Sequence, residues 1–145
     1  MTVSAVRALG LDLGSKRVGV AIGDRTGTIA SPLQVLQRTG NMRRDHEQIA
    51  KIVAEEEADI VVVGLPLNMN GSSGPAARAA IDEAAALATV VSVPVVTFDE
   101  RRTTVTADQA MMEANMRAQA RRRIVDKIAA AVMLQNWLDA GGPRQ

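Results

Sequence analysis

Three acidic positions in this sequence end or interrupt apolar segments. Asp12 lies near the end of segment 8–13 and alternates there with the small residues Ala8 and Gly10. Such a segment predicts a strand, and a carboxylate at the end of a central strand is costly to bury unless hydrogen bonds, a cation or a metal ion satisfy it. The competing interpretation is an aspartate that only caps the turn at Gly14.

The second acidic position is the pair Asp99 and Glu100, which follows the apolar segment 93–98. If both segments are parallel strands, this pair and Asp12 lie at the same edge of the sheet, where open α/β folds place their sites. Successive strand side chains point to opposite faces, so only one acid of the pair can join Asp12. A polar strand exit before a helix cap at Thr103 is the simpler alternative.

The third position, Asp126, lies on the apolar face of a helix predicted over 124–140. Steps of three and four residues lead from it to Ala129, Ala130, Met133 and Trp137. An acid in the first turn would be favoured by the helix dipole, but that position requires no apolar face. The two alanines would let the helix approach the sheet closely.

The composition restricts the chemistry that these acids can perform. The 145 residues include no cysteine and one histidine, which excludes thiolate and multi-histidine metal sites. Mg²⁺ and Mn²⁺ take oxygen ligands, so carboxylates from two strand ends and a helix favour a divalent-ion site that activates water against a phosphodiester. The candidate metal ligands are therefore Asp12, one of Asp99 and Glu100, and Asp126.

Basic residues accompany these acids, although the formal net charge is only +1. Segment 101–127 carries seven positive charges against three acids, which predicts phosphate binding with a steep salt dependence. A solvated helix connection is the alternative. The chain has two aromatic residues, too few to stack on bases, so recognition by backbone path is expected. The candidate nucleic-acid contacts are Lys16, Arg17, Arg101, Arg117, Arg121, Arg122 and Arg123.

The elements that must position these residues follow one another in the order of a mixed sheet. Strands are predicted over 8–13, 17–23, 28–36, 60–63 and 93–98, and helices over 41–58, 75–89, 103–115 and 124–140. Pro32 predicts an edge strand or a bulge. Three strands that can form a meander, followed by strand–helix alternation, predict an α/β fold with parallel crossovers in one domain, 1–145.

Four motifs in this sequence together resemble the YqgF/RuvX family. They are GLDLGSKRVGVA (10–21), VGLPLNMNGS (63–72), DERRTT (99–104) and DKIAA (126–130). The resemblance implies an RNase H-like five-stranded sheet of order 3-2-1-4-5, with strand 2 antiparallel and helices on both faces. Carried over by position, the family's acidic site falls on Asp12, Glu100 and Asp126.

The resemblance also implies the activity of a Mg²⁺- or Mn²⁺-dependent endonuclease, a phosphodiester hydrolase. The family is described both as a Holliday junction resolvase and as a nuclease that matures the 5′ end of pre-16S ribosomal RNA. The expected partner is branched DNA or structured pre-rRNA, and symmetric cutting of a junction would require a homodimer. No apolar run approaches the length of a membrane span and no signal peptide is recognisable, so we expect a cytoplasmic protein without a membrane partner.

Two other classes of protein compete with a nuclease. A non-catalytic nucleic-acid-binding module could keep the same fold. A phosphotransferase of the actin and sugar-kinase type is the other, because residues 12–16 resemble the first phosphate loop of those enzymes. Such enzymes close two domains over a nucleotide, whereas 145 residues supply one domain.

Overall fold

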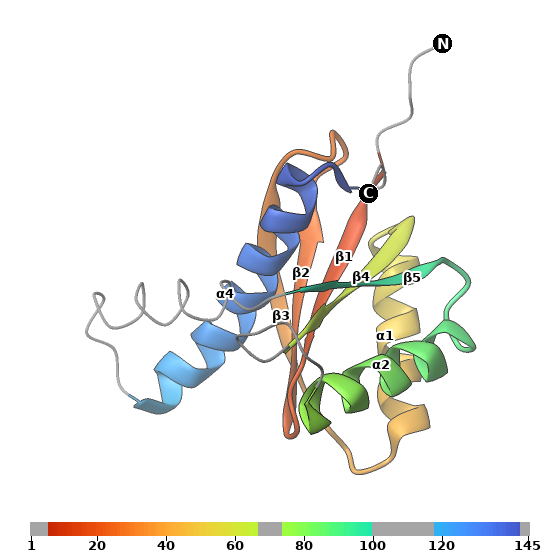
Figure 1. Ribbon diagram of the computed structural model, residues 1–145, viewed down its shortest axis with the longest axis vertical. Coiled ribbons are helices and arrows are strands. Elements are labelled where there is room, and N and C mark those ends of the chain that lie inside the picture. The colour runs from red at the N-terminus through yellow and green to blue at the C-terminus, as the bar shows by residue number, and fades with distance from the viewer. Residues whose placement is uncertain (1–5, 67–73, 100–117, 143–145) are drawn as a thin grey trace.

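Five strands form one sheet with helices on both of its faces (Figure 1). The computed structural model describes residues 6–66, 74–99 and 118–142, with the backbone alone for 118–127. The strands are β1 (Ala8–Leu13), β2 (Arg17–Gly23), β3 (Ala30–Gln37), β4 (Ile60–Leu65) and β5 (Val95–Asp99), and the helices are α1 (Met42–Glu55), α2 (Pro75–Ala88) and α4 (Ala118–Asp139). The order β3-β2-β1-β4-β5 confirms the expected mixed sheet with β1 at its centre.

Strand directions bring three strand ends to one edge of the sheet. β1 is antiparallel to β2 and parallel to β4, and β4 is parallel to β5 with Leu65 opposite Asp99. The ends of β1, β4 and β5 at Leu13, Leu65 and Asp99 therefore define one edge, which we call the carboxyl edge. The β1–β2 turn, residues 14–16, lies at this edge because it directly follows β1.

β3 is the edge strand that Pro32 predicted, and it also contains a bulge. Val20 is opposite Gln34 and the next residue of β2, Ala21, is opposite Pro32, so Leu33 is the extra residue. Proline has no N–H to donate to a ladder, which restricts it to such edges and bulges. Both expectations for Pro32 are confirmed.

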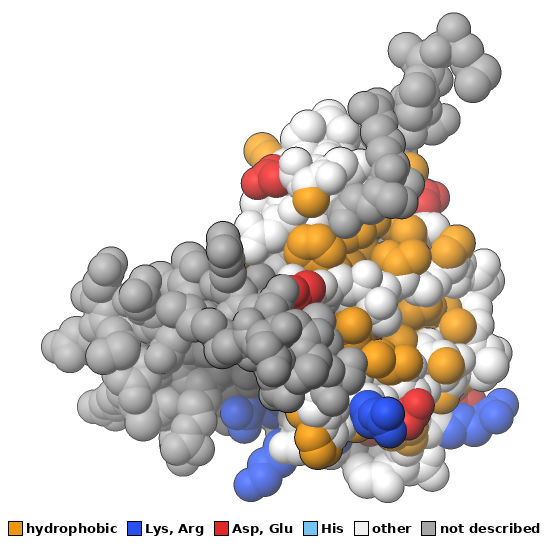
Figure 2. All heavy atoms as spheres, in the orientation of Figure 1, with side chains coloured by type: hydrophobic (Ala, Val, Ile, Leu, Met, Phe, Trp, Pro, Cys, Tyr) orange, Lys and Arg blue, Asp and Glu red, His pale blue; other side chains and the backbone are white. Residues whose placement is uncertain are grey.

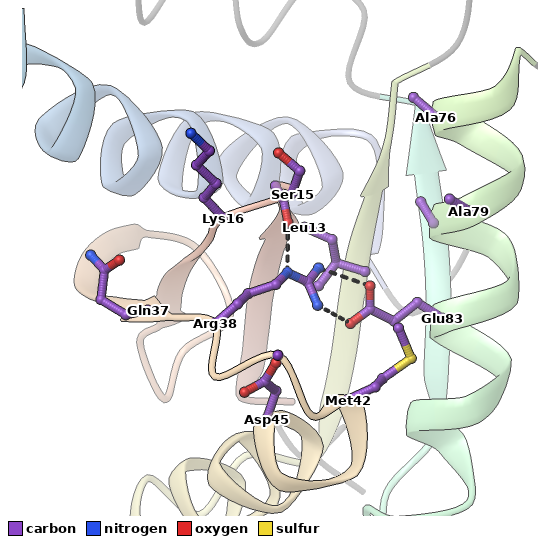
Figure 3. A pocket seen from close by; sticks show the side chains of 13 residues that line it. Leu13, Ser15, Lys16, Gln37, Arg38, Met42, Asp45, Ala76, Ala79 and Glu83 are labelled. Atoms are coloured by element: carbon purple, nitrogen blue, oxygen red, sulfur yellow. Dashed lines mark hydrogen bonds and ion pairs between the residues drawn. The ribbon is translucent and has the colours of Figure 1, made fainter.

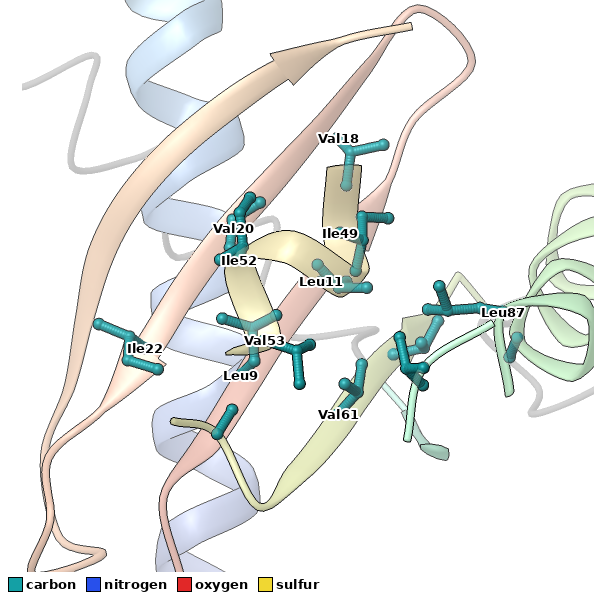
Figure 4. Close-up of a cluster of buried hydrophobic side chains, with 14 residues drawn as sticks. Leu9, Leu11, Val18, Val20, Ile22, Ile49, Ile52, Val53, Val61 and Leu87 are labelled. Atoms are coloured by element: carbon teal, nitrogen blue, oxygen red, sulfur yellow. The ribbon is translucent and has the colours of Figure 1, made fainter. Parts of the chain in front are cut away.

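One face of the sheet packs against α1 and α2, and we call it the α1–α2 face. Leu9 and Leu11 of β1 lie in a buried cluster with Ile49 of α1, Val61 of β4 and Leu87 of α2 (Figure 4). α1 begins after Asn41, whose side chain accepts a hydrogen bond from the backbone N–H of Arg44. This N-cap fixes the start of α1, and the helix packs its apolar stripe against the sheet.

The opposite face packs against α4, and we call it the α4 face. Ala8, Ala21 and Val62 form a second buried cluster there with a stripe from α4, comprising Ala130, Ala131, Met133, Leu134 and Trp137. A Cβ atom at Gly10 would lie 3.0 Å from Cβ of Leu134 and 3.4 Å from the carbonyl oxygen of Ala130. The close approach of this helix to β1, which the alanines of the stripe predicted, is confirmed.

α4 begins earlier than expected. Its first residue is Ala118, six residues before the predicted start at 124. Residues 118–123 are good helix formers without an apolar stripe, so periodicity did not reveal them. Asp126 therefore lies beyond the first turn of α4, and an acid that merely serves the helix dipole is the wrong interpretation of it. The helix predicted over 103–115 lies outside the described residues.

None of the helices within residues 6–66, 74–99 and 118–142 combines the length and the hydropathy of a membrane-spanning segment.

Candidate active site

Asp12 lies at the carboxyl edge on the α4 face. It is the fifth residue of β1, is opposite Gly19 of β2, and its side chain is partly buried. Alternation along β1 places it on the same face as Ala8 and Gly10, which lie against α4, while Leu9 and Leu11 lie in the other cluster. The face predicted for Asp12 is confirmed, and the small residues beside it keep that face open to a helix.

The acid that ends β5 lies on the other face. Val96 and Phe98 pack against the α4-face cluster, whereas Val95 packs against the α1–α2 cluster. Asp99 is four residues after Val95 in the same alternation and is opposite Leu65, so it lies on the α1–α2 face of the sheet. Glu100 lies outside the described residues. Within the described chain, the sheet therefore separates Asp99 from Asp12.

The direction of α4 relates the backbone of Asp126 to Asp12. Gln135 of α4 accepts a hydrogen bond from the N–H of Ala30 at 2.9 Å and donates to the carbonyl of Thr28 at 2.8 Å. Ala30 is opposite Gly23, at the end of the sheet remote from the carboxyl edge. α4 therefore runs from the carboxyl edge towards that remote end, and position 126 lies one turn nearer the carboxyl edge than Ala130.

The described side chains include Asp12 alone of the three predicted metal ligands. Among them, no group of three acidic, histidine or cysteine side chains lies together. The set of Asp12, Glu100 and Asp126 therefore remains a prediction.

The cations predicted to contact phosphate fall into three groups. Lys16 is exposed in the β1–β2 turn, and Arg17 is partly buried at the start of β2. Positions 121–123 lie within α4 by their backbone, not in a connection between helices. Arg101 and Arg117 lie outside the described residues. On the face in Figure 2, the visible Lys and Arg side chains lie along the lower edge of the molecule, where Figure 1 places the β1–β2 turn.

The β1–β2 turn is tight, and glycine is required in it. The N–H of Gly14 donates to the carbonyl oxygen of Arg17 at 2.9 Å. A Cβ atom at Gly14 would lie only 2.6 Å from that oxygen, which is a steric clash. The turn therefore brings Lys16 and Arg17 back beside the end of β1 that carries Asp12.

A buried polar network on the α1–α2 face was not predicted from the sequence. Arg38 follows β3, and its Nη1 and Nη2 donate to Oε2 and Oε1 of Glu83, both at 2.8 Å. His46 Nε2 lies 2.9 Å from the same Oε2. The signal was present in α2, where Glu83 interrupts the buried stripe of Ala77, Ala80, Ala84 and Leu87.

Glu83 is ionised in this network. Burial acts to raise the pKa of its carboxyl group, but hydrogen bonds and the charges of Arg38 and His46 outweigh burial and hold the pKa below its usual value. An ionised carboxylate only accepts hydrogen bonds, so Nε2 of His46 carries the hydrogen and donates.

Relatives of this chain share most of its length. The sequence matches the RuvX family, described as Holliday junction resolvase, over residues 6–140. A protein of Thermoanaerobacter pseudethanolicus named "Putative pre-16S rRNA nuclease" is 41% identical over 93% of this chain and 97% of its own. Proteins with the same name from Mycobacterium sp. (strain KMS) and Myxococcus xanthus are 46% and 42% identical over 92% and 95% of this chain, and 79% and 91% of their own.

Solved structures share the fold at low sequence identity. RuvC of T. thermophilus in complex with a Holliday junction substrate has a TM-score of 0.58 and 13% identity, covering 94% of this chain and 97% of RuvC. A second T. thermophilus RuvC structure has a TM-score of 0.54 and 14% sequence identity, with the same coverage of both chains. The RNase H-like fold is thereby confirmed. The chain belongs to the RuvX family, described as Holliday junction resolvase, and the enzyme class that the family and these relatives share is that of a phosphodiester hydrolase.

Proposed function

We propose that this chain is a divalent-metal-dependent endonuclease whose ion is held by Asp12, Glu100 and Asp126. The observation that carries the proposal is the position of Asp12, partly buried on the α4 face at the carboxyl edge. The backbone of α4 places residue 126 towards that same edge. Since Asp99 lies on the face opposite to Asp12, Glu100 is the member of the pair that we assign to the ion.

The residues fit a hard divalent ion. All three proposed ligands are carboxylates, and Mg²⁺ or Mn²⁺ prefers oxygen ligands while keeping several waters. The small residues Ala8 and Gly10 fill little of the face beside Asp12. When bound, such an ion would polarise the phosphate and lower the pKa of a water that attacks it.

The protein's own cations hold the nucleic acid beside these acids. Lys16 and Arg17 follow Asp12 through the tight β1–β2 turn, which supports the proposal that they bind phosphates next to the bond that is cut. Positions 121–123 lie less than two turns before residue 126 in α4. We propose that Arg101, Arg117, Arg121, Arg122 and Arg123 extend the phosphate-binding surface.

The proposed substrate is structured pre-16S ribosomal RNA. The relatives at 41–46% identity carry the name of that activity, whereas RuvC, named with a Holliday junction, is only 13% identical. A four-way DNA junction is the second candidate because the family description names it. Cutting both strands of a junction symmetrically requires two copies, so we associate a homodimer with that second candidate only.

A direct comparison tests this proposal. Purified protein is given a pre-16S 5′ precursor fragment and a four-way DNA junction at equal salt, with Mg²⁺ or Mn²⁺ and then with excess chelator. We expect cleavage that requires the ion, and a preference of tenfold or more, about 1.4 kcal/mol, for the precursor. Cleavage undiminished by chelator contradicts the metal site. Binding without any cleavage supports the non-catalytic module, and thermal stabilisation by nucleotide supports the phosphotransferase.

The folding unit for this activity is proposed to be one domain that spans 1–145.

A further inference from the structure

Arg38 contacts the β1–β2 turn through both its backbone and its side chain. Its backbone N–H donates to the carbonyl oxygen of Lys16 at 3.0 Å, and its side-chain Nε donates to the carbonyl oxygen of Gly14 at 2.7 Å. The turn also has a hydrogen bond of its own, from the N–H of Gly14 to the carbonyl of Arg17. Arg38 thus fixes two carbonyls of the four-residue segment 14–17.

Apolar packing does not replace these contacts on the α1–α2 side of the turn. A cavity of about 690 Å³ lies between the turn and α2, lined on one side by Leu13, Ser15 and Lys16 and on the other by Ala76 and Ala79. Figure 3 shows the guanidinium of Arg38 between the turn and Glu83, with hydrogen bonds in both directions. The strand ladders hold both ends of the turn, and on this side the hydrogen bonds of Arg38 add contacts across the space that the cavity leaves.

Arg38 is itself held rigidly. Glu83 binds the guanidinium through two bonds of 2.8 Å, and His46 of α1 binds Glu83 at 2.9 Å. The side chains of Arg38 and Glu83 are 15% and 7% exposed, and that of His46 is 2% exposed. A bidentate pair of this kind fixes the plane of the guanidinium as well as its position, and a lysine cannot reproduce it.

We infer that Arg38 is a positioning residue for nucleic-acid cleavage. By fixing the segment 14–17, it sets where Lys16 and Arg17 stand relative to Asp12, two residues before the turn, and Glu83 with His46 sets Arg38. This inference rests on the proposed function, because it assigns Lys16, Arg17 and Asp12 to the reaction. A displacement of about 1 Å at such a site can cost up to about 100-fold in rate.

The chain offers a matched control at the other end of the sheet. Nε of Arg7 donates to the carbonyl oxygen of Gly23 at 3.1 Å, and its Nη2 donates to Glu56 at 3.2 Å. The Arg7 side chain is 20% exposed, close to the value for Arg38. Arg7 thus repeats the arrangement of Arg38, a glycine carbonyl on one side and a glutamate on the other, remote from the carboxyl edge.

The experiment compares Arg38→Lys with Arg7→Lys in the full chain. Amide hydrogen exchange is measured on peptides that cover residues 12–19, and single-turnover cleavage is measured on the preferred substrate. We expect Arg38→Lys to raise exchange in that segment at least about tenfold and to slow cleavage about tenfold or more. We expect Arg7→Lys to lower the melting temperature while leaving both other quantities within about twofold of the parent.

The two arms separate this inference from the proposed function. Equal exchange in residues 12–19 for the two variants overturns the inference, and so does faster exchange in Arg38→Lys with cleavage like that of Arg7→Lys. A parent chain that cuts no substrate overturns the proposed function, while the exchange result still decides whether Arg38 fixes the turn. If Arg38→Lys does not fold, Glu83→Gln, which keeps one carbonyl acceptor for the guanidinium, is expected to change exchange and cleavage in the same direction by a smaller factor.

Discussion

Asp12 and Asp99 meet at the same edge of the sheet but lie on its opposite faces. Asp12 shares the α4 face with Gly10, whereas Asp99 shares the α1–α2 face with Val95. The sheet itself separates the two carboxylates, so neighbouring strand ends do not by themselves make a joint site. This relationship gives a pair of conservative substitutions with opposite expected outcomes.

Asp12→Asn is expected to reduce cleavage about 100-fold or more, because loss of even an outer-shell partner of a metal site costs about 10- to 100-fold. Asp99→Asn, at the same edge, is expected to keep cleavage within about threefold. Single-turnover assays with Mn²⁺ check both variants. An Asp12→Asn variant that cuts normally would return Asp12 to a turn-capping role, since asparagine caps nearly as well as aspartate.

The same pair predicts the response of thermal stability to metal. Without a divalent ion, Asp12→Asn is expected to melt at the parent temperature or higher, because in the proposed site it removes one of three carboxylates whose like charges would repel one another. Added Mn²⁺ is expected to stabilise the parent by binding its native state, and this shift in melting temperature is expected to shrink in Asp12→Asn but not in Asp99→Asn. Melting curves with and without Mn²⁺ measure both effects, and equal shifts in all three proteins would contradict the metal assignment.

Gly10→Ala is expected to destabilise the fold by about 1–3 kcal/mol, since the new methyl group meets Cβ of Leu134 at 3.0 Å in a packed core. Gly23→Ala is the matched control in the neighbouring strand, where a Cβ atom would meet Ala8 at 3.4 Å, an ordinary contact distance. Denaturant unfolding of both variants measures the difference. Equal losses of stability in the two variants would contradict an extra cost of the close contact between Gly10 and α4.

Glu83→Gln is expected to lower stability by about 1–3 kcal/mol at pH 7, because a buried charge-assisted network loses its charge. The folded state lowers the pKa of Glu83 below its usual value of 4.5. Its stabilising contribution is therefore complete above that value and is lost as the pH falls through the lower folded pKa. The difference in free energy of unfolding between the parent and Glu83→Gln is expected to narrow below pH 4.5.

The control for Glu83 is Glu47→Gln, which removes a charge from an exposed pair with Arg43 at 3.8 Å. Such surface pairs contribute about 0–1 kcal/mol, so little change is expected at any pH. Urea unfolding from pH 3 to pH 7 compares the three proteins. A gap between parent and Glu83→Gln that does not depend on pH would contradict the ionised network.

Replacing Arg121, Arg122 and Arg123 together with Ala is expected to weaken substrate binding and to flatten its salt dependence. Each phosphate contact contributes about 0.9 to the slope of log K against log[salt] for duplex DNA, so the slope falls by up to about 3. The control replaces Arg43, Arg44 and Lys51, three exposed cations of α1, which packs on the other face. Binding isotherms at several salt concentrations measure both slopes, and equal slopes would mean that residues 121–123 contact solvent only.

Local patterns in the sequence determined the order of the strands and helices along the chain, both ends of β1 and β2, and the face of Asp12, whereas the order of the strands in the sheet came from the family resemblance. The first three follow from alternation, from the tight turn at Gly14 and from β-branched runs, all of which act over a few neighbouring residues. The same patterns misplaced the start of an element in two places. Residues 118–123 of α4 lack an apolar stripe, and Pro94 moves the start of β5 to a later residue. β5 begins at Val95 and not at residue 93, because Pro94 has no N–H to donate and only its carbonyl pairs, with Val61.

Tertiary structure alone decided which groups meet. Glu83 follows Arg38 by 45 residues and His46 by 37 residues. No local pattern relates a residue after β3 to one in α2. The face of Asp99 likewise required the packing of Val95 and Phe98, because an alternating strand does not reveal which of its sides meets which helix. Periodicity acts along the chain, whereas a hydrogen bond across a sheet edge depends on how separate elements pack, so the sequence identified Asp12 but not the arginine that holds the turn beside it.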